Sequence, residues 1–201
     1  MTTPTQLTPG VDQLAAAIRE LMEATVRAQG GDVAHATDLV RQATASLADL
    51  REGPWVVGGT DASPYNTVVG SGNPIAAPVH LTCKGSDGVS GTVCFGTPYE
   101  GAPGLVHGGV LAMVMDQVFG EAGIAAQVAG MTIGLEIRYA APTPVHTPLQ
   151  LEAHVVASGE RFVEMAGSIK AGDTTTVTAT ATFFRLTEKH ARRIFPHLIR
   201  E

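Results

Sequence analysis

One acidic side chain lies in an otherwise apolar stretch of this chain, shortly after a pair of glycines. The segment begins His107-Gly108-Gly109 and continues through six apolar residues to Asp116. Apolar residues or glycine then occupy every position to residue 125 except Gln117 and Glu121, and a helix that is apolar nearly all round is typically buried. We therefore expect Asp116 to be desolvated, which makes it a candidate general base or nucleophile. Because structural networks also bury acids, this pattern by itself leaves a structural role open.

The two glycines mark the expected start of this helix. Unpaired backbone N–H groups at a helix N-terminus form a positive, donor-rich end that can hold a developing oxyanion. A glycine there lets a substrate carbonyl approach the backbone, although glycine also serves simply to turn a chain tightly. Taken together with Asp116, Gly108 and Gly109 favour a catalytic function.

The spacing of these groups predicts an assembly. Gly108 and Asp116 lie eight positions apart, or about 12 Å along a helix at about 1.5 Å per residue. One carbonyl carbon cannot contact both groups of the same chain. We therefore expect Asp116 to meet the Gly108 amide of a second subunit across an isologous interface, so that catalysis requires a homodimer.

Other catalytic machinery is not evident in the sequence. No serine occupies a Gly-x-Ser-x-Gly motif, and Cys83 and Cys94 fall in strand-like segments where we expect buried, reduced, structural thiols. Phosphate-cradling loops and dinucleotide fingerprints are also missing. The histidines lack the close paired spacing of a metal site, so we expect no bound metal. They are residues 35, 80, 107, 146, 154, 190 and 197.

Composition limits the class of protein. The chain has 201 residues, 44% of them hydrophobic and 16% charged, which suits one globular domain with an extension. It has no apolar run of the roughly 18 residues that a membrane span needs, and its start lacks the features of a secretory signal, so we expect a cytoplasmic protein without membrane insertion. The net charge of −6 argues against nucleic-acid binding.

The pattern along the chain predicts four parts. Residues 1–50 contain two amphipathic helical runs, 12–29 and 34–50, which suggest a helical hairpin. Residues 51–77 are rich in Gly, Pro, Ser and Asn and form an irregular connector. Residues 78–187 hold the main domain, and residues 188–201 form an amphipathic tail.

Within the main domain the pattern predicts two strands, one long helix and four further strands. Such an order indicates an α+β fold in which a curved antiparallel sheet wraps a helix. The expected strands are 79–84, 89–95, 132–140, 149–158, 162–171 and 175–186, and the expected helix is 109–128.

These segments resemble the hotdog-fold acyl-CoA thioesterases of the PaaI and THEM-like group over about residues 63–186. The resemblance implies the hotdog fold and hydrolysis of an acyl-CoA to a carboxylic acid and CoA, with CoA as part of the substrate and no other cofactor. The matching segments are Glu100 to Gly109 with an acid nine residues after His107, a strand opening with Thr132 and closing at Arg138 to Pro144, and the segments Ser63 to Asn66 and Gly70 to Pro74.

The resemblance also implies roles for individual residues. Asp116 would attack the thioester or activate the attacking water, and Thr132 would hold that water. Gly108, together with Gly109, would supply the oxyanion N–H, with His107 shaping the loop or binding near the thioester. One position departs from the pattern, because several members have Asn six residues before the histidine and this chain has Gly101.

The phosphates of CoA require cations, and the main domain offers few. Arg161, at a strand start, and Arg138 are the candidates for contacts with CoA, although a solvated turn charge is an equally physical role for Arg161. The cations of this region are Lys84, Arg138, Arg161, Lys170 and Arg185.

The sequence thus favours an acyl-CoA thioesterase that works as a homodimer, or as a homotetramer built from two such dimers. One alternative is a hotdog dehydratase or hydratase of acyl thioesters. Such an enzyme would need a histidine base placed against an acid, and the sequence shows no evident histidine partner for Asp116. The other is a non-catalytic acyl-CoA-binding protein. For the N-terminal hairpin, the apolar stripes suggest that it packs on the dimer or covers the acyl tunnel.

Overall fold

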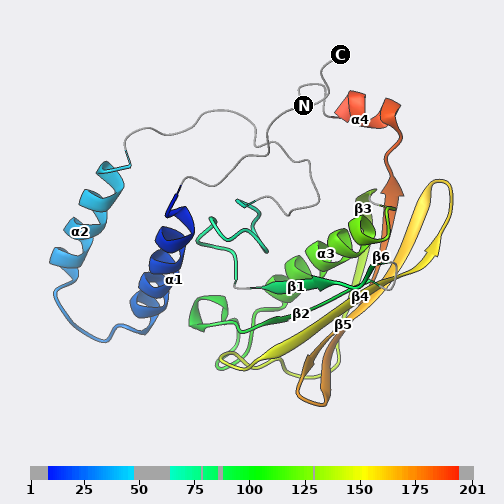
Figure 1. The fold of residues 1–201 in the computed structure, drawn as a ribbon. Coiled ribbons are helices and arrows are strands. Elements are labelled where there is room, and N and C mark those ends of the chain that lie inside the picture. Colours follow the sequence, from blue (N-terminus) through cyan, green and yellow to red (C-terminus); the bar gives the residue numbers. More distant parts are fainter. Residues whose placement is uncertain (1–8, 48–63, 78, 86–87, 129, 195–201) are drawn as a thin grey trace.

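A computed structural model of the chain describes residues 9–47, 64–77, 79–85, 88–128 and 130–194 (Figure 1). The elements follow the predicted order, with two N-terminal helices, a β-β-α-β-β-β-β domain and a short C-terminal helix. They are α1 (Val11–Arg27), α2 (Val33–Ala45), β1 (His80–Cys83), β2 (Val89–Val93), the 3₁₀ helix η2 (Thr97–Tyr99), α3 (Gly108–Ala125), β3 (Gly130–Tyr139), β4 (Leu149–Ser158), β5 (Phe162–Ala171), β6 (Thr174–Arg185) and α4 (Glu188–Ile194).

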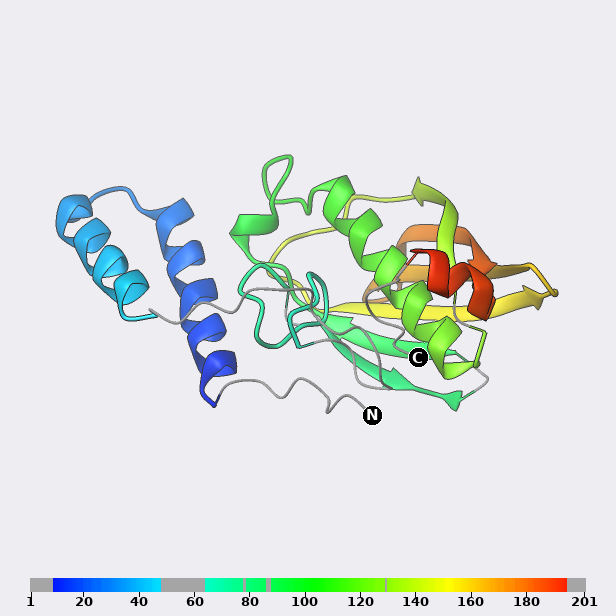
Figure 2. The same cartoon turned by 90° about the horizontal axis from the view of Figure 1, so that it is seen from above.

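The six strands form one antiparallel sheet in the order β1-β2-β4-β5-β6-β3, so β1 and β3 are its edges. The sheet curves around α3, which crosses one face of it (Figures 1 and 2). This arrangement confirms the predicted α+β fold. The predicted hairpin between the first two strands is also confirmed, since β1 and β2 are paired from His80 opposite Thr92 to Cys83 opposite Val89.

Alternation along the strands separates the two faces of the sheet. In β4, Leu149, Leu151 and Ala153 are buried, while the residues between them are exposed. A strand with this period has one face on the core and the other in water. We call the face that packs on α3 the inner face, and the opposite one the outer face.

The core lies between α3 and the inner face. Met115 and Phe119 of α3 are fully buried there. Gly167 of β5 allows their close approach, because a Cβ at this position would lie 2.7 Å from Met115 Cε and 3.1 Å from Phe119 Cε1. The remaining fully buried large side chains come from α3, β4, β5, β6 and the segment after β2, and they include Phe95, Leu149, Leu151, Met165 and Ile169.

A bulge shifts the alternation of β3. Thr132 is opposite Phe183 of β6, but Gly134 is opposite the next residue, Thr182, so Ile133 is the extra residue. A bulge of one residue exchanges the faces for the rest of a strand. As a consequence Tyr139 lies on the inner face with Thr132, and Arg138 lies on the outer face.

Two predictions about burial were wrong. One side of α3 is open, with Met113 38% and Ile124 42% exposed, so this helix is not covered all round within a single chain. Cys83 and Cys94 are both exposed rather than buried. Cys83 ends an edge strand, and Cys94 lies between the buried Val93 and Phe95, which turns it to the opposite side.

The two N-terminal helices differ in their contacts. Helix α1 contacts η2 and the 64–77 segment, with Ala15 buried and Arg19 Nη1 donating to Asn73 O at 3.1 Å. Every residue of α2 is exposed, and both helices lie beyond one end of the sheet in both views (Figures 1 and 2). That this hairpin covers an acyl tunnel or packs on a dimer stays a prediction, and its expected last residues, 48–50, lie outside the described part.

The C-terminal helix α4 contacts the end of β6, where the His190 ring lies 5.0 Å from that of Phe184. The rest of the predicted tail, residues 195–201, and residues 51–63 of the predicted connector lie outside the described residues. None of the helices in the described ranges is long and apolar enough to cross a membrane.

Candidate functional site

His107 caps the N-terminus of α3 with its own ring. Its backbone is extended, with φ −61° and ψ 133°, and its Nδ1 accepts the N–H of Gly109 at 3.0 Å. The backbone N–H of His107 in turn donates to Tyr99 O of η2 at 2.9 Å. The predicted role of His107 in shaping the loop therefore has a geometric basis, since it fixes both the loop and the first turn of the helix.

Gly108 and Gly109, the two predicted oxyanion donors, differ in their hydrogen bonds. The peptide between Gly108 and Gly109 is bonded at both ends, because Tyr139 Oη donates to Gly108 O at 2.8 Å and the Gly109 N–H is held by His107. The first residue of a helix has no intrahelical acceptor for its N–H. The Gly108 N–H therefore remains as the donor for a ligand, whereas that of Gly109 is occupied while the cap is formed.

Asp116 and Thr132 are brought together from α3 and β3. The Thr132 hydroxyl donates to Asp116 Oδ1 at 2.8 Å, with Thr132 exposed and Asp116 half-buried. The other carboxylate oxygen, Oδ2, has no hydrogen-bond partner among the residues that the structure describes. A carboxylate with one oxygen held and one free can accept a proton from a bound water.

The carboxylate of Asp116 lies on the open side of α3, among apolar groups. Gly109, Met113, Asp116, Gly120 and Ile124 recur at three- and four-residue spacing and so share one side of the helix. The neighbouring edge strand β3 adds three exposed apolar side chains. They are Met131, Ile133 and Leu135.

Gly101 has a steric role in the loop before α3. A Cβ at this position would lie 2.9 Å from His107 Cα and 3.0 Å from His107 Cδ2. The loop returns on itself there, with the Gly101 N–H donating to Leu105 O. Any larger side chain at residue 101 would require the His107 cap to shift, so glycine suits this position.

A polar network that the sequence did not reveal lies beside Asp116. Asn66 Nδ2 donates to Gln117 Oε1 at 2.9 Å, and Gln117 Nε2 donates to Glu121 Oε1 at 2.8 Å. Glu121 is only 9% exposed. The network holds the 64–77 segment onto the side of α3. Its signal in the sequence was the pair of polar interruptions, Gln117 and Glu121, one helical turn apart.

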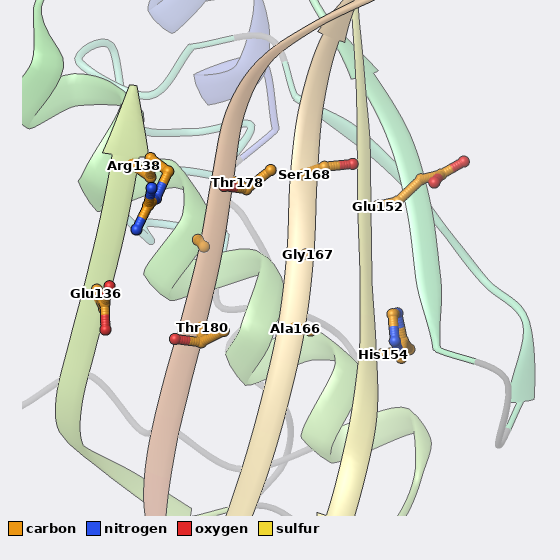
Figure 3. A pocket seen from close by; sticks show the side chains of 10 residues that line it. Glu136, Arg138, Glu152, His154, Ala166, Gly167, Ser168, Thr178 and Thr180 are labelled. Atoms are coloured by element: carbon orange, nitrogen blue, oxygen red, sulfur yellow. The ribbon is translucent and has the colours of Figure 1, made fainter. Parts of the chain in front are cut away.

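The two arginines predicted to contact CoA lie away from Asp116. Arg138 lies on the outer face of the sheet, opposite the side that carries α3 (Figure 3). Arg161 lies in the turn before β5, with its guanidinium carbon 5.5 Å from the centre of the Phe162 ring. The structure therefore brings together Asp116, Thr132 and the open side of α3, but neither arginine.

No group of three or more His, Cys, Asp or Glu side chains that could hold a metal ion occurs in the described ranges. The chemistry available at this site consists of one carboxylate, one hydroxyl and one helix-terminal N–H.

Comparisons with known proteins agree with this fold. Residues 103–181 match the family model of the thioesterase superfamily. A crystal structure of a thioesterase superfamily protein is 29% identical and covers 90% of this chain and 97% of its own, with a TM-score of 0.79. No curated protein matches the chain with significance.

Two more distant structures share the fold. A hypothetical thioesterase from Streptococcus pneumoniae, solved with coenzyme A, is 22% identical and covers 53% of this chain and 87% of its own, with a TM-score of 0.51. That protein was also solved as two variants in which an aspartate or a threonine was replaced by alanine. Thioesterase superfamily member 2 of zebra fish is 15% identical and covers 54% and 81%, with a TM-score of 0.50.

The fold, the match of residues 103–181 and the likeness along nine-tenths of the chain lead to one conclusion: this chain has the hotdog fold of thioesterase superfamily structures.

Proposed function

We propose that this protein is an acyl-CoA thioesterase of the PaaI and THEM-like kind, with Asp116 as its catalytic base. The observation that carries the proposal is the 2.8 Å hydrogen bond from Thr132 Oγ1 to Asp116 Oδ1 on the open side of α3. CoA as part of the substrate is supported by the fold relatives solved with coenzyme A and with acetyl CoA. A thioester suits so small a site, because the thiolate leaves readily and a base with an oxyanion donor suffices.

The reaction needs one water molecule. Asp116 Oδ2 accepts a proton from the water as the water oxygen bonds to the thioester carbonyl carbon, and the carbonyl oxygen becomes an oxyanion that the Gly108 N–H of a second copy stabilises. The C–S bond then breaks, the acyl group leaves as the carboxylic acid, and the CoA thiolate takes the proton from Asp116. Thr132 donates its proton to Oδ1, which leaves its oxygen lone pairs to hold the water.

The sequence separation of two replaced residues in a protein of the same fold supports the pairing of Asp116 with Thr132. The aspartate and threonine replaced in the pneumococcal variants stand sixteen positions apart in that chain. Asp116 and Thr132 are also separated by sixteen positions and are hydrogen-bonded to each other.

We further propose that the working unit is a dimer through α3 and the β3 edge. Both elements carry exposed apolar side chains, Met113 and Ile124 on α3 and Ile133 and Leu135 on β3, and an open strand edge has unpaired N–H and C=O groups. Two α3 helices packed antiparallel and crossing near Ala112 would place Gly108 of one copy beside Asp116 of the other, because residue 112 lies midway between them. The apolar surroundings then exclude water from all but the reacting site.

For the nucleotide end of CoA, we propose Arg161 with Phe162. The Arg161 guanidinium lies over the Phe162 ring, which is 44% exposed and packs edge-on against Phe184. An aromatic face can stack with adenine, and a guanidinium can pair with a phosphate. Replacing Arg161 by alanine should raise the KM for acyl-CoA and leave kcat within about twofold.

A thiol-release assay tests the function. Wild type and Asp116→Asn are compared over short, long and aromatic acyl-CoAs, with Asp173→Asn, an exposed acid at the β5–β6 turn, as the matched control. We expect hydrolysis by wild type and the control, and a loss of about 10²-fold or more in kcat for Asp116→Asn. CoA binding by a wild type that releases no thiol would indicate a binding protein, and reversible hydration of an enoyl-CoA would indicate a hydratase.

A further inference from the structure

Tyr139, the last residue of β3, lies beside the first turn of α3. Its Oη donates to Gly108 O at 2.8 Å, and its backbone is paired with Val177 of β6. The chain just after it is also held, because the Ala140 N–H donates to Thr176 O at 2.9 Å. The hydroxyl therefore approaches the helix from a strand end whose position is fixed by the neighbouring strand.

Gly108 and Tyr139 fit each other sterically. A Cβ on Gly108 would lie 3.0 Å from Tyr139 Oη and 3.1 Å from its Cζ. Cβ contacts this short are rare, so any larger residue at position 108 would push the phenol ring away from the helix. Glycine at this position thus admits the Tyr139 hydroxyl to the backbone carbonyl, in addition to letting a substrate approach.

Two consecutive glycines give the start of α3 more conformational freedom than other residues would. Contacts restrain the two peptide units there in turn. The His107–Gly108 peptide is held at its carbonyl end, where His107 O accepts the Val110 N–H at 3.0 Å. The Gly108–Gly109 peptide is held at its N–H by the His107 ring and at its carbonyl by Tyr139.

These restraints direct the Gly108 N–H. In a trans peptide the C=O and N–H groups point in opposite directions. Because His107 O points into the first turn of α3, the Gly108 N–H points out of the helix end. Tyr139 holds the carbonyl on the other side of the same residue, so its hydroxyl opposes rotation about the backbone bonds of Gly108.

The exposure of Tyr139 separates this effect from a contribution to the core. The residue is 54% exposed, so its ring buries little apolar surface within the chain. We therefore expect loss of the hydroxyl to change the free energy of unfolding little, while it removes one of the two side chains that hold the Gly108–Gly109 peptide.

We propose that Tyr139 is a positioning residue for the oxyanion donor. Through Gly108 O, its hydroxyl keeps the Gly108 N–H in the direction in which it meets the thioester carbonyl. A donor that is already oriented stabilises the developing charge without having to reorganise during the reaction. This inference rests on the proposed function, because Gly108 serves as an oxyanion donor only in a protein that cleaves a thioester.

Tyr139→Phe removes only the hydroxyl and tests this proposal. In the thiol-release assay we expect kcat to fall about tenfold and KM to stay within about twofold, because the donor acts in the transition state. The urea midpoint should be that of wild type. Tyr65→Phe, which removes the same atom from a residue of the 64–77 segment, should keep the wild-type kcat. An unchanged kcat in Tyr139→Phe, or a fall accompanied by a lower urea midpoint, would overturn the positioning role.

A second variant tests whether Tyr139 acts on the same peptide as His107. In a His107→Ala background the Gly108–Gly109 peptide has already lost one of its two restraints. Adding Tyr139→Phe should then lower kcat by less than about threefold, since the two changes are coupled. A further tenfold loss in that background would mean that Tyr139 acts elsewhere, and would overturn the proposal.

Asp116→Asn, measured beside these variants, separates the two proposals. If Asp116→Asn releases thiol as fast as wild type, the proposed function itself fails. If Asp116→Asn loses activity and Tyr139→Phe keeps it, the function stands and only the positioning role of Tyr139 is overturned.

Discussion

The inner and outer faces of one sheet differ sharply in what their side chains can do. The inner face is largely apolar, and two of its polar side chains, Thr132 and Tyr139, hydrogen-bond to α3. The outer face carries hydroxyls, small residues and charged side chains, among them Glu136, Arg138 and Glu152. Since alternate residues of the same strands supply both, a shift of one residue decides whether a side chain serves chemistry or surface contact.

The largest expected effect distinguishes a substitution on the open side of α3 from one on the outer face of the sheet. Met113→Arg, on the open side of α3, should prevent the catalytic dimer and lower kcat/KM by about 10²-fold, because each carboxylate would lose the oxyanion donor of its partner. Glu136→Arg on the outer face, a charge reversal away from α3, should leave kcat/KM within about twofold.

Mass measurement and thiol release on the same samples provide the comparison, with Met113→Leu as the conservative control that should keep both. A Met113→Arg protein that is monomeric and fully active would contradict the shared site.

The next prediction compares how substitutions at two neighbouring residues of β5 change the stability of the fold. A Cβ on Gly167 would lie 2.5 Å from Glu152 O and 2.7 Å from Met115 Cε, so Gly167→Ala should destabilise the fold by about 1–3 kcal/mol through overpacking. Ala166→Ser, one residue away on the outer face, should change the free energy of unfolding by less than about 0.5 kcal/mol. Urea denaturation measures both, and equal losses would mean that the faces are not distinct.

These two faces also show what the sequence could and could not predict. Residues 149–158 and 162–171 were predicted as strands with the bounds that β4 and β5 have, the second of them from its alternation. The pairing of Asp116 with Thr132 came from the resemblance, and their contact at 2.8 Å agrees with it. Regular period-two packing and a shared motif are local signals, so they can be read from a sequence.

The bulge in β3 could not be predicted from such a local pattern. Counting alternate residues from Thr132 places Arg138 on the inner face and Tyr139 on the outer face, but the extra residue Ile133 reverses both. Gly134, just after the bulge, was the available hint. The open side of α3 was missed for another reason, because an apolar surface that a second chain would cover looks the same in a sequence as one buried within a single chain.

A smaller effect compares two threonines on opposite faces. Thr132→Ala removes the hydroxyl that donates to Asp116 and should lower kcat by about tenfold, which corresponds to about 1.4 kcal/mol. Thr178→Ala, on the outer face, should leave kcat unchanged. Thr132→Ser keeps the hydroxyl and should retain most of the activity, and a Ser variant as slow as the Ala variant would show that the methyl group, not the hydrogen bond, matters.

The smallest expected effect concerns α1, which contacts the loop that supports the inner face. Glu23 of α1 accepts hydrogen bonds from the N–H and the hydroxyl of Thr97, each at 2.8 Å, and lies 3.7 Å from His146 Nε2. Burial alone would raise the pKa of Glu23, but the Thr97 and Arg27 hydrogen bonds and the charge of His146 together bring it below its usual 4.5. A depressed carboxyl pKa means that the folded chain favours the charged form, so the contact stabilises docking of α1 above about pH 4.5 and weakens as the pH falls through the lowered value.

Glu23→Gln should therefore loosen α1 at pH 7 in the way that acid loosens it in wild type. Small-angle scattering should show a larger radius of gyration for this variant at pH 7, and wild type should approach that radius only at low pH. Glu20→Gln, one turn earlier on the same helix and exposed, should behave like wild type. Because η2 reaches the active loop through the bond from His107 N to Tyr99 O, a loosened α1 should lower kcat by less than about twofold. A Glu23→Gln protein with the wild-type radius at pH 7 would show that apolar contacts around Ala15 hold α1 without the carboxylate.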